Sequence, residues 1–163
     1  MNNQKEFVES LFSKKERKKL WVLPAITNGE IDLEKERVVT WIHPSGHIGY
    51  VVYNDGGNFT AFMMDRLSDK SKSKKVVMCA WCLSIKPSAN MTMFSRPTSD
   101  NSCFSVGLCA ELNCLSSIRN INPDTMPETL TREQKEQRYF HNLESYISTY
   151  VRGKHANRNT GDS

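Results

Sequence analysis

The chain has 163 residues, of which 38% are hydrophobic and 25% charged, and its formal net charge is +4. This length fits one domain with attached segments, and the composition allows a packed core over most of the chain. No run approaches the ~18 apolar residues of a membrane helix, and the polar first twenty residues do not match an export signal. We therefore expect a cytoplasmic protein without a membrane segment, in which thiols stay reduced.

Residues 1–20 are predicted to form an N-terminal amphipathic helix. Asn3 is a candidate cap with Glu6 three residues later. The apolar stripe has helical spacing and consists of Phe7, Val8, Leu11 and Phe12. The cluster KKERKK at 14–19 suits the negative C-terminal end of a helix dipole. Pro24 is expected to keep the following chain extended.

Residues 21–75 are predicted to form a β-rich subdomain. The segments 37–42, 48–54 and 58–64 are rich in β-branched and aromatic residues, and the turn sequences HPSGH and DGG separate them. This pattern is typical of an antiparallel meander. The polar run SDKSKSKK at 68–75 is predicted to be an exposed loop.

Residues 76–121 carry two short-spaced cysteine pairs within further strand patterns. VVMC, NMTMF and SCFSVGLC are predicted strands, and a short helix is expected after Cys114, where Leu115 and Ile118 have helical spacing. The first pair, Cys79 and Cys82, is separated from the second, Cys109 and Cys114, by 26 residues.

Residues 122–153 are predicted to be a linker followed by a C-terminal helix, and 154–163 a disordered tail. Thr131 and Gln134 form a candidate capping box, and Gly153 is a candidate stop. One face of this helix is apolar and is expected to be core rather than partner-facing: Tyr139, Phe140, Leu143, Tyr146, Ile147 and Tyr150.

The four paired cysteines predict one zinc ion. They could instead be small buried hydrophobic residues. A C-x2-C pair, however, directs both sulfurs toward one point, and a second short-spaced pair completes a tetrahedron with bonds of about 2.3 Å. Zinc is the favoured interpretation, with Cys79, Cys82, Cys109 and Cys114 as its ligands.

A fifth cysteine, Cys103, is expected not to be a ligand. It lies six residues before Cys109 in a predicted strand, where successive side chains alternate between faces. Cys114 is preferred because it begins a helix, whose N-terminal dipole favours a thiolate. A cysteine pair, a hairpin and a strand that enters a helix together form the arrangement of a treble-clef zinc finger.

The predicted zinc is structural, and no enzyme is expected. A catalytic zinc keeps an open position and usually has histidine or carboxylate ligands, whereas four thiolates close the shell. The chain has neither a glycine-rich phosphate loop nor a G-x-S-x-G elbow. His43 and His47 flank a predicted turn. A surface role is favoured for them, and the alternative is that they are catalytic residues of a zinc hydrolase.

At this point the chain resembles a known family. The sequence CAWCLS…NMTMFSRPT…SVGLCAELNCLSSIRN, followed by ETLTREQKEQRYFHNLESYISTYVRG, is similar to the C-terminal treble-clef zinc-finger domain of elongation-factor-G-binding proteins, which include the fusidic-acid-resistance proteins. The resemblance covers roughly residues 36–153. In the strand before the third cysteine, Phe104 and Gly107 stand where relatives are expected to have a lysine and a tyrosine.

The resemblance implies that the zinc finger binds elongation factor G and helps to release it from the ribosome. The same four cysteines would then be the zinc ligands. The partner surface would lie on the hairpin and helix around the metal, with Phe94, Arg96, Phe104 and Arg119 as candidate contact residues. A monomer is favoured.

We therefore predict an α+β fold, in which an antiparallel β-meander is joined to a treble-clef zinc finger between an N-terminal and a C-terminal helix. The alternative function is that of an RNA- or ribosome-binding protein. It would use the basic patches at 14–19 and 66–75, with Trp81, Phe94 or Phe104 as stacking platforms.

Overall fold

The computed structural model describes residues 2–67, 76–87, 90–97, 102–120 and 130–152. The helices are α1 (Asn2–Leu11), α2 (Lys14–Arg17), α3 (Pro24–Thr27), α4 (Cys114–Arg119), α5 (Arg132–Tyr146) and the π-helical segment η3 (Ile147–Val151). The strands are β1 (Val38–Ile42), β2 (Ile48–Asp55), β3 (Asn58–Leu67), β4 (Val76–Met78), β5 (Ile85–Pro87), β6 (Met91–Pro97) and β7 (Cys103–Cys109). This mixture of helices with antiparallel strands confirms the predicted fold class.

Five strands form one antiparallel sheet in the order β1-β2-β3-β6-β7, and β4 and β5 form a separate ribbon. The predicted meander is confirmed as β1-β2-β3, with Trp41 opposite Tyr50 and Tyr50 opposite Met63. The end of β3 then pairs with β6, where Arg66 lies opposite Phe94. The sheet thus runs from the predicted β-rich subdomain into the predicted zinc finger. The strand β5 was not predicted.

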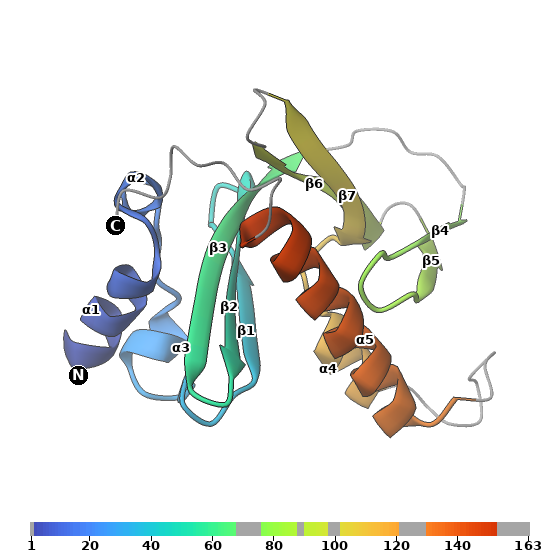
Figure 1. Ribbon diagram of the computed structural model, residues 1–163, viewed down its shortest axis with the longest axis horizontal. Helices are drawn as coiled ribbons and strands as arrows, with labels where there is room; N and C mark the ends of the chain where they lie inside the picture. The colour runs from blue at the N-terminus through green and yellow to red at the C-terminus, as the bar shows by residue number, and fades with distance from the viewer. Residues whose placement is uncertain (1, 68–75, 88–89, 98–101, 121–129, 153–163) are drawn as a thin grey trace.

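Helices cover both faces of β1–β3, with α1–α3 on one side and α5 on the other (Figure 1). Because side chains alternate along a strand, neighbouring residues of β2 enter different cores. The N-terminal core contains Val8, Phe12, Ile26, Leu33, Val39, Trp41, Tyr50 and Val52. The C-terminal core contains residues of the sheet such as Val51, Tyr53 and Phe62, the four paired cysteines and the apolar stripe of α5. Two covered faces explain why the middle of β2 is buried without alternation.

The N-terminal segment differs from the single capped helix that was predicted. Asn3 lies inside α1 instead of capping it. The helix ends at Leu11, and Ser13 caps α2 by accepting a hydrogen bond from the backbone N–H of Glu16 at 3.2 Å. The break lets Phe12 pack edge-on against Trp41 and Tyr50 in the N-terminal core. Tertiary packing and a serine cap therefore outweigh the local helical pattern.

The prediction that Pro24 keeps the chain extended was also wrong. Pro24 is the first residue of α3. Its fixed φ suits this position, and its missing N–H costs nothing there because the first helical N–H groups have no partner inside the helix.

The C-terminal helix follows its prediction closely. Thr131 accepts a hydrogen bond from the N–H of Gln134, whose side chain accepts one from the N–H of Thr131, so the capping box is confirmed. The apolar stripe packs in the C-terminal core, as expected for a core face. The predicted loop at 68–75, the stop at Gly153 and the tail lie outside the described residues, as does most of the predicted linker.

Candidate metal centre

The first cysteine pair lies in a tight turn directly after β4, which we call the first knuckle (residues 79–84). The N–H of Leu83 donates to the carbonyl of Cys79 at 2.9 Å, and the N–H of Cys79 donates to the carbonyl of Ser84 at 3.0 Å. Leu83 has φ of 58°, a left-handed conformation that bends the chain sharply. The turn brings the side chains of Cys79 and Cys82 to the same side.

The second pair spans the junction of β7 and α4, the second knuckle (residues 109–114). Cys109 ends the strand and Cys114 begins the helix, as predicted. Leu112 has φ of 54°, and its N–H donates to the carbonyl of Cys109 at 2.9 Å. A left-handed leucine costs roughly 1–2 kcal/mol. Its side chain is buried in the C-terminal core, which offsets that cost.

The two knuckles bring four sulfur atoms together. The Sγ atoms of Cys79, Cys82, Cys109 and Cys114 all lie within 4.8 Å of one another, and all four residues are buried. Cys79 and Cys114 have their sulfurs 3.6 Å apart, and Cys82 and Cys109 have theirs 3.7 Å apart. A disulfide would need about 2.05 Å. A tetrahedron with metal–sulfur bonds of about 2.3 Å has edges of about 3.8 Å. The cluster therefore has the size that one zinc ion requires.

The four sulfurs differ in protonation: the pKa is lowered for Cys79 and Cys82 and raised for Cys109 and Cys114. Hydrogen bonds with Cys109 and Cys114 lower the pKa of Cys79 to about 7, and hydrogen bonds with Cys109, Cys114 and Cys79 lower the pKa of Cys82. The pKa of Cys114 is raised because it hydrogen-bonds with Cys109, Cys79 and Cys82 and is buried. Cys79 and Cys82 therefore have thiolate character near neutral pH, and the thiolate is the form that binds metal.

Helix α5 supports the first knuckle through two side chains one helical turn apart. Arg138 donates to the carbonyl of Cys82 at 3.3 Å, and Asn142 donates to that of Trp81 at 2.9 Å. Sequence analysis did not identify either residue, although their i,i+4 spacing on a predicted helix places them on one face.

The sheet supports the second knuckle. Thr40 of β1 donates to the carbonyl of Leu112 at 2.7 Å, and Arg66 of β3 donates to that of Ala110 at 2.9 Å. The two knuckles are thus oriented by different parts of the fold. Nothing local in the sequence indicates the contacts of Thr40 and Arg66, because they join segments 72 and 44 residues apart.

Cys103 and the two histidines of the predicted turn lie outside the sulfur cluster. Cys103 is exposed and is the first residue of β7, whereas a position inside the strand was expected. His43 lies against Trp21 with ring centroids 6.2 Å apart, and its Nδ1 accepts a hydrogen bond from the N–H of Ser45.

The candidate partner residues have unequal access to solvent. Phe94 has 0% and Arg96 7% of its surface exposed, and Trp81 is also buried. Phe94 and Trp81 have almost no exposed surface for a partner or for base stacking, and Arg96 reaches solvent only beside the pocket between α2, β3 and β6. Their roles as contact residues stay predictions. A strand pattern alone does not reveal that both faces of this sheet are covered.

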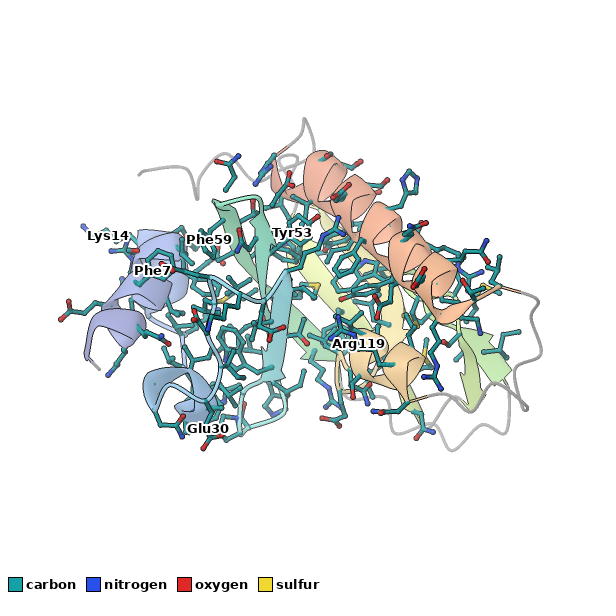
Figure 2. The ribbon with its side chains drawn as sticks, turned by 90° about the horizontal axis from the view of Figure 1, so that it is seen from below. Phe7, Lys14, Glu30, Tyr53, Phe59 and Arg119 are labelled. Atoms are coloured by element: carbon teal, nitrogen blue, oxygen red, sulfur yellow. The ribbon has the colours of Figure 1, made fainter. Side chains whose placement is uncertain are left out.

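Arg119 is exposed, and Phe104 is half-buried against the C-terminal core. Phe104 stacks on Tyr150, with ring centroids 3.8 Å apart and an interplanar angle of 9°. Arg119 extends from α4 and donates to Glu136 of α5 at 2.8 Å (Figure 2).

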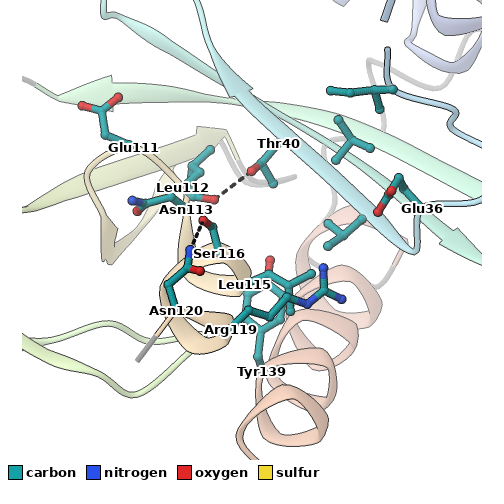
Figure 3. A pocket seen from close by; sticks show the side chains of 13 residues that line it. Glu36, Thr40, Glu111, Leu112, Asn113, Leu115, Ser116, Arg119, Asn120 and Tyr139 are labelled. Atoms are coloured by element: carbon teal, nitrogen blue, oxygen red, sulfur yellow. Dashed lines mark hydrogen bonds between the residues drawn. The ribbon is translucent and has the colours of Figure 1, made fainter. Parts of the chain in front are cut away.

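A cavity of about 510 Å³ opens beside Arg119, between β1 and α4. Leu112, Leu115 and Tyr139 supply its apolar part, and Glu36 and Glu111 are among its polar lining (Figure 3). The hydroxyl of Ser116, which also lines it, accepts a hydrogen bond from Asn120. Among the lining residues there is no histidine or cysteine that could act as base or nucleophile.

Comparisons with known proteins place the chain in a family. None of the helices in the described residues has the length and apolarity to cross a bilayer.

No curated protein matches the chain. One matching solved structure is that of the fusidic acid resistance protein FusC, with 14% identity and a TM-score of 0.45 over 82% of this chain and 54% of that one. The chain therefore spans about half the length of that structure. A family model described as "FBP C-terminal treble-clef zinc-finger" matches residues 5–150, and the chain thus belongs to this treble-clef zinc-finger family.

Proposed function

We propose that this protein is a non-enzymatic, zinc-stabilised binding protein that binds elongation factor G and influences its release from the ribosome. The buried four-sulfur cluster carries the proposal, because it has the size for one zinc in a chain of a zinc-finger family. Cys79, Cys82, Cys109 and Cys114 would hold this ion. The similarity of the cysteine and C-terminal helix motifs to elongation-factor-G-binding proteins supports the choice of partner.

The chemistry of the sulfur cluster supports a structural role for the metal. Four thiolates fill a tetrahedral shell and leave no position for water or substrate. Burial of all four cysteines keeps solvent away from the ion. A metal held in this way fixes the positions of both knuckles relative to α4 and α5. Its function is to shape the surface around it.

The ribbon β4–β5 next to the first knuckle is a candidate docking surface. Met78 and Ile85 lie opposite each other across the ribbon and are 53% and 64% exposed. Met78 directly precedes Cys79, so zinc would fix its position. Exposed apolar side chains beside a rigid element are typical of the centre of a protein–protein interface. We infer that this pair, with Arg119 on α4, contacts the partner protein.

The alternative function, RNA binding, is favoured by one observation. The basic residues of the 14–19 patch lie on α2 and the turn after it, and each of the lysines and the arginine is exposed. Stacking on Trp81 or Phe94 is not available because both are buried. RNA binding through this patch would be electrostatic and would weaken steeply with salt, unlike an interface with an apolar centre.

The decisive experiment is a titration of the zinc-loaded protein with purified elongation factor G at two salt concentrations. We expect saturable binding with a weak salt dependence. The double variant Met78→Ser/Ile85→Ser should weaken binding by about tenfold or more, since buried apolar anchors contribute most of such affinity.

The matched control is Leu67→Ser/Met93→Ser. These residues form another exposed cross-strand pair, on β3 and β6. Their replacement should leave the affinity unchanged. Absence of binding to elongation factor G would reject the proposed partner, and equal weakening by both double variants would reject the proposed surface.

A further inference from the structure

A second site lies outside the sulfur cluster, where α2 meets the sheet. It is a pocket of about 160 Å³ between α2, β3 and β6. A water occupies about 30 Å³ of liquid, so the pocket has room for a polyatomic ion. The charged residues that line it are Lys15, Glu16, Lys19, Asp65 and Arg96.

Arg96 is a buried cation with incomplete pairing. Only 7% of it is exposed, its Nη1 donates to the carbonyl of Met63 at 2.7 Å, and its guanidinium lies 5.3 Å from the centre of the Phe62 ring. Its Nε is buried and has no hydrogen-bond partner among the described residues. None of the ion pairs found in the described ranges includes Arg96. A buried charge without a close ion-pair partner is costly, so this environment favours an anion beside it.

Two carboxylates share the pocket, and neither forms an ion pair with Arg96 in the described ranges. Burial raises the pKa of Glu16, and the nearby charge of Arg96 counteracts that rise. Glu16 lies in the same pocket, but its Oε1 accepts from the hydroxyl of Ser13 and its Oε2 accepts from the N–H of Met63, both at 3.2 Å. Asp65 is exposed at the pocket wall. Lys15 and Lys19 are exposed and add two positive charges to the lining. The cations of the pocket therefore outnumber its carboxylates.

We propose that this pocket binds a phosphate group, with Arg96 as its buried anchor and Lys15 and Lys19 at its mouth. The guanidinium of Arg96 supplies a buried positive charge with an unpartnered N–H, and the two lysines act as point charges at the mouth of the pocket. The phosphate would come either from a free ion or from an RNA backbone. This site goes beyond the proposed function, because it shares no residue with the sulfur cluster or the β4–β5 surface.

The most direct test observes the Arg96 side chain. In a ¹⁵N-labelled, zinc-loaded protein, titration with inorganic phosphate at constant ionic strength should shift the Nε–H resonance of Arg96 in a saturable way. The Nε–H of Arg66, which already donates to the carbonyl of Ala110, is the internal control and should not move. An Arg96 resonance that stays unchanged with inorganic phosphate and with RNA overturns the proposal.

A pair of double variants tests the contribution of the lysines without disturbing the core. Lys15→Gln/Lys19→Gln should weaken phosphate binding by about tenfold, the expected effect of two exposed charge contacts. Lys14→Gln/Lys18→Gln removes the same charge from the same segment, but neither residue lines the pocket, so its effect should stay below about twofold. Equal weakening by the two variants would show a diffuse charge effect and overturn the pocket.

A short single-stranded RNA distinguishes the two sources of phosphate. An Arg96 shift with RNA as well as with inorganic phosphate supports a backbone phosphate, and a shift with inorganic phosphate alone supports a free ion. RNA binding that is lost equally in both double variants, with no Arg96 shift, overturns the proposal, since the contact would then involve only the surface of α2.

Discussion

The two faces of β1–β3 are stabilised in different ways. On the N-terminal face, rings pack against each other, with centroids of Trp41 and Tyr50 5.2 Å apart and those of Phe12 and Tyr50 6.1 Å apart. The polar atoms of these rings are paired, because Tyr50 donates to the carbonyl of Lys19 and Trp41 donates to that of Trp21. Apolar burial and satisfied hydrogen bonds are sufficient to stabilise this core.

The C-terminal face contains the four cysteines and more unpaired polar atoms. The indole N–H of Trp81 and the hydroxyl of Tyr146 are buried without a hydrogen-bond partner in the described part of the chain. Burial raises the pKa of Tyr146 to about 12. An unpaired buried polar group costs about 1–3 kcal/mol. A metal between the sulfurs would supply a stabilising interaction that offsets this cost.

The largest expected effect is the loss of the metal, which should disrupt the C-terminal core and leave the N-terminal core folded. Cys82→Ser should abolish zinc binding and unfold the knuckles, because zinc binding contributes on the order of 10 kcal/mol to folding in such modules. Elemental analysis and near-UV circular dichroism measure the two losses. Cys103→Ser should retain one zinc per chain, and a loss of zinc in this control would contradict the proposed ligand set.

A substitution in the N-terminal core should lower stability without changing metal binding. Phe12→Ala removes a buried ring that contacts Trp41 and Tyr50, and should lower the free energy of unfolding by about 3–5 kcal/mol. Zinc content should remain unchanged below the melting temperature. Denaturant unfolding and metal analysis of the same sample check this, and release of zinc by the folded variant would show that the two faces are coupled.

Gly49 lies where the sheet contacts the second knuckle. A Cβ at Gly49 would lie 2.8 Å from Phe94 and 2.9 Å from Leu112, so Gly49→Ala should destabilise by about 1–3 kcal/mol and weaken zinc binding. Gly107→Ala is the matched control, since its Cβ would meet only Met93 at an ordinary 3.6 Å. Competition with a chelator measures zinc affinity, and equal affinities of the two variants would contradict the role of Gly49.

The smallest effect concerns the edge where β1 and β2 meet α5. The hydroxyl of Tyr53 donates a hydrogen bond to Glu144, and Arg37 adds a second at 3.1 Å, so the pKa of Glu144 lies below its ordinary value of 4.5. A lowered folded pKa contributes stability above the unfolded pKa, and this contribution is lost as pH falls through the folded pKa. Glu144→Gln should therefore reduce the acid-induced loss of stability below about pH 4.5.

This effect should stay under about 1 kcal/mol because Glu144 is partly exposed and water screens its charge. Thermal unfolding from pH 6 to pH 3 measures it. Tyr53→Phe removes the hydroxyl that donates to Glu144 and should reduce the pH dependence in the same direction. A wild-type pH profile retained in both variants would contradict the assigned cause.

Local rules in the sequence determined several of the elements and the pairing of the four cysteines. The β-branched segments formed β1–β3, Thr131 and Gln134 formed a capping box, and Cys114 began a helix, as expected from contacts within a few residues. Sequence spacing also placed Cys79 beside Cys82, since three residues of chain limit how far two side chains can separate. These features depend on short-range geometry, which sequence reports directly.

Which side chains remain exposed depends on contacts between segments that are distant in the sequence. The pairing of β3 with β6 joined two predicted subdomains in one sheet, and cover on both faces buried Phe94 and Arg96. The N-terminal helix broke before Ser13 because Phe12 packs on rings that lie some thirty to forty residues further along the chain. Burial is a sum of contacts from distant segments, and no local pattern contains that sum.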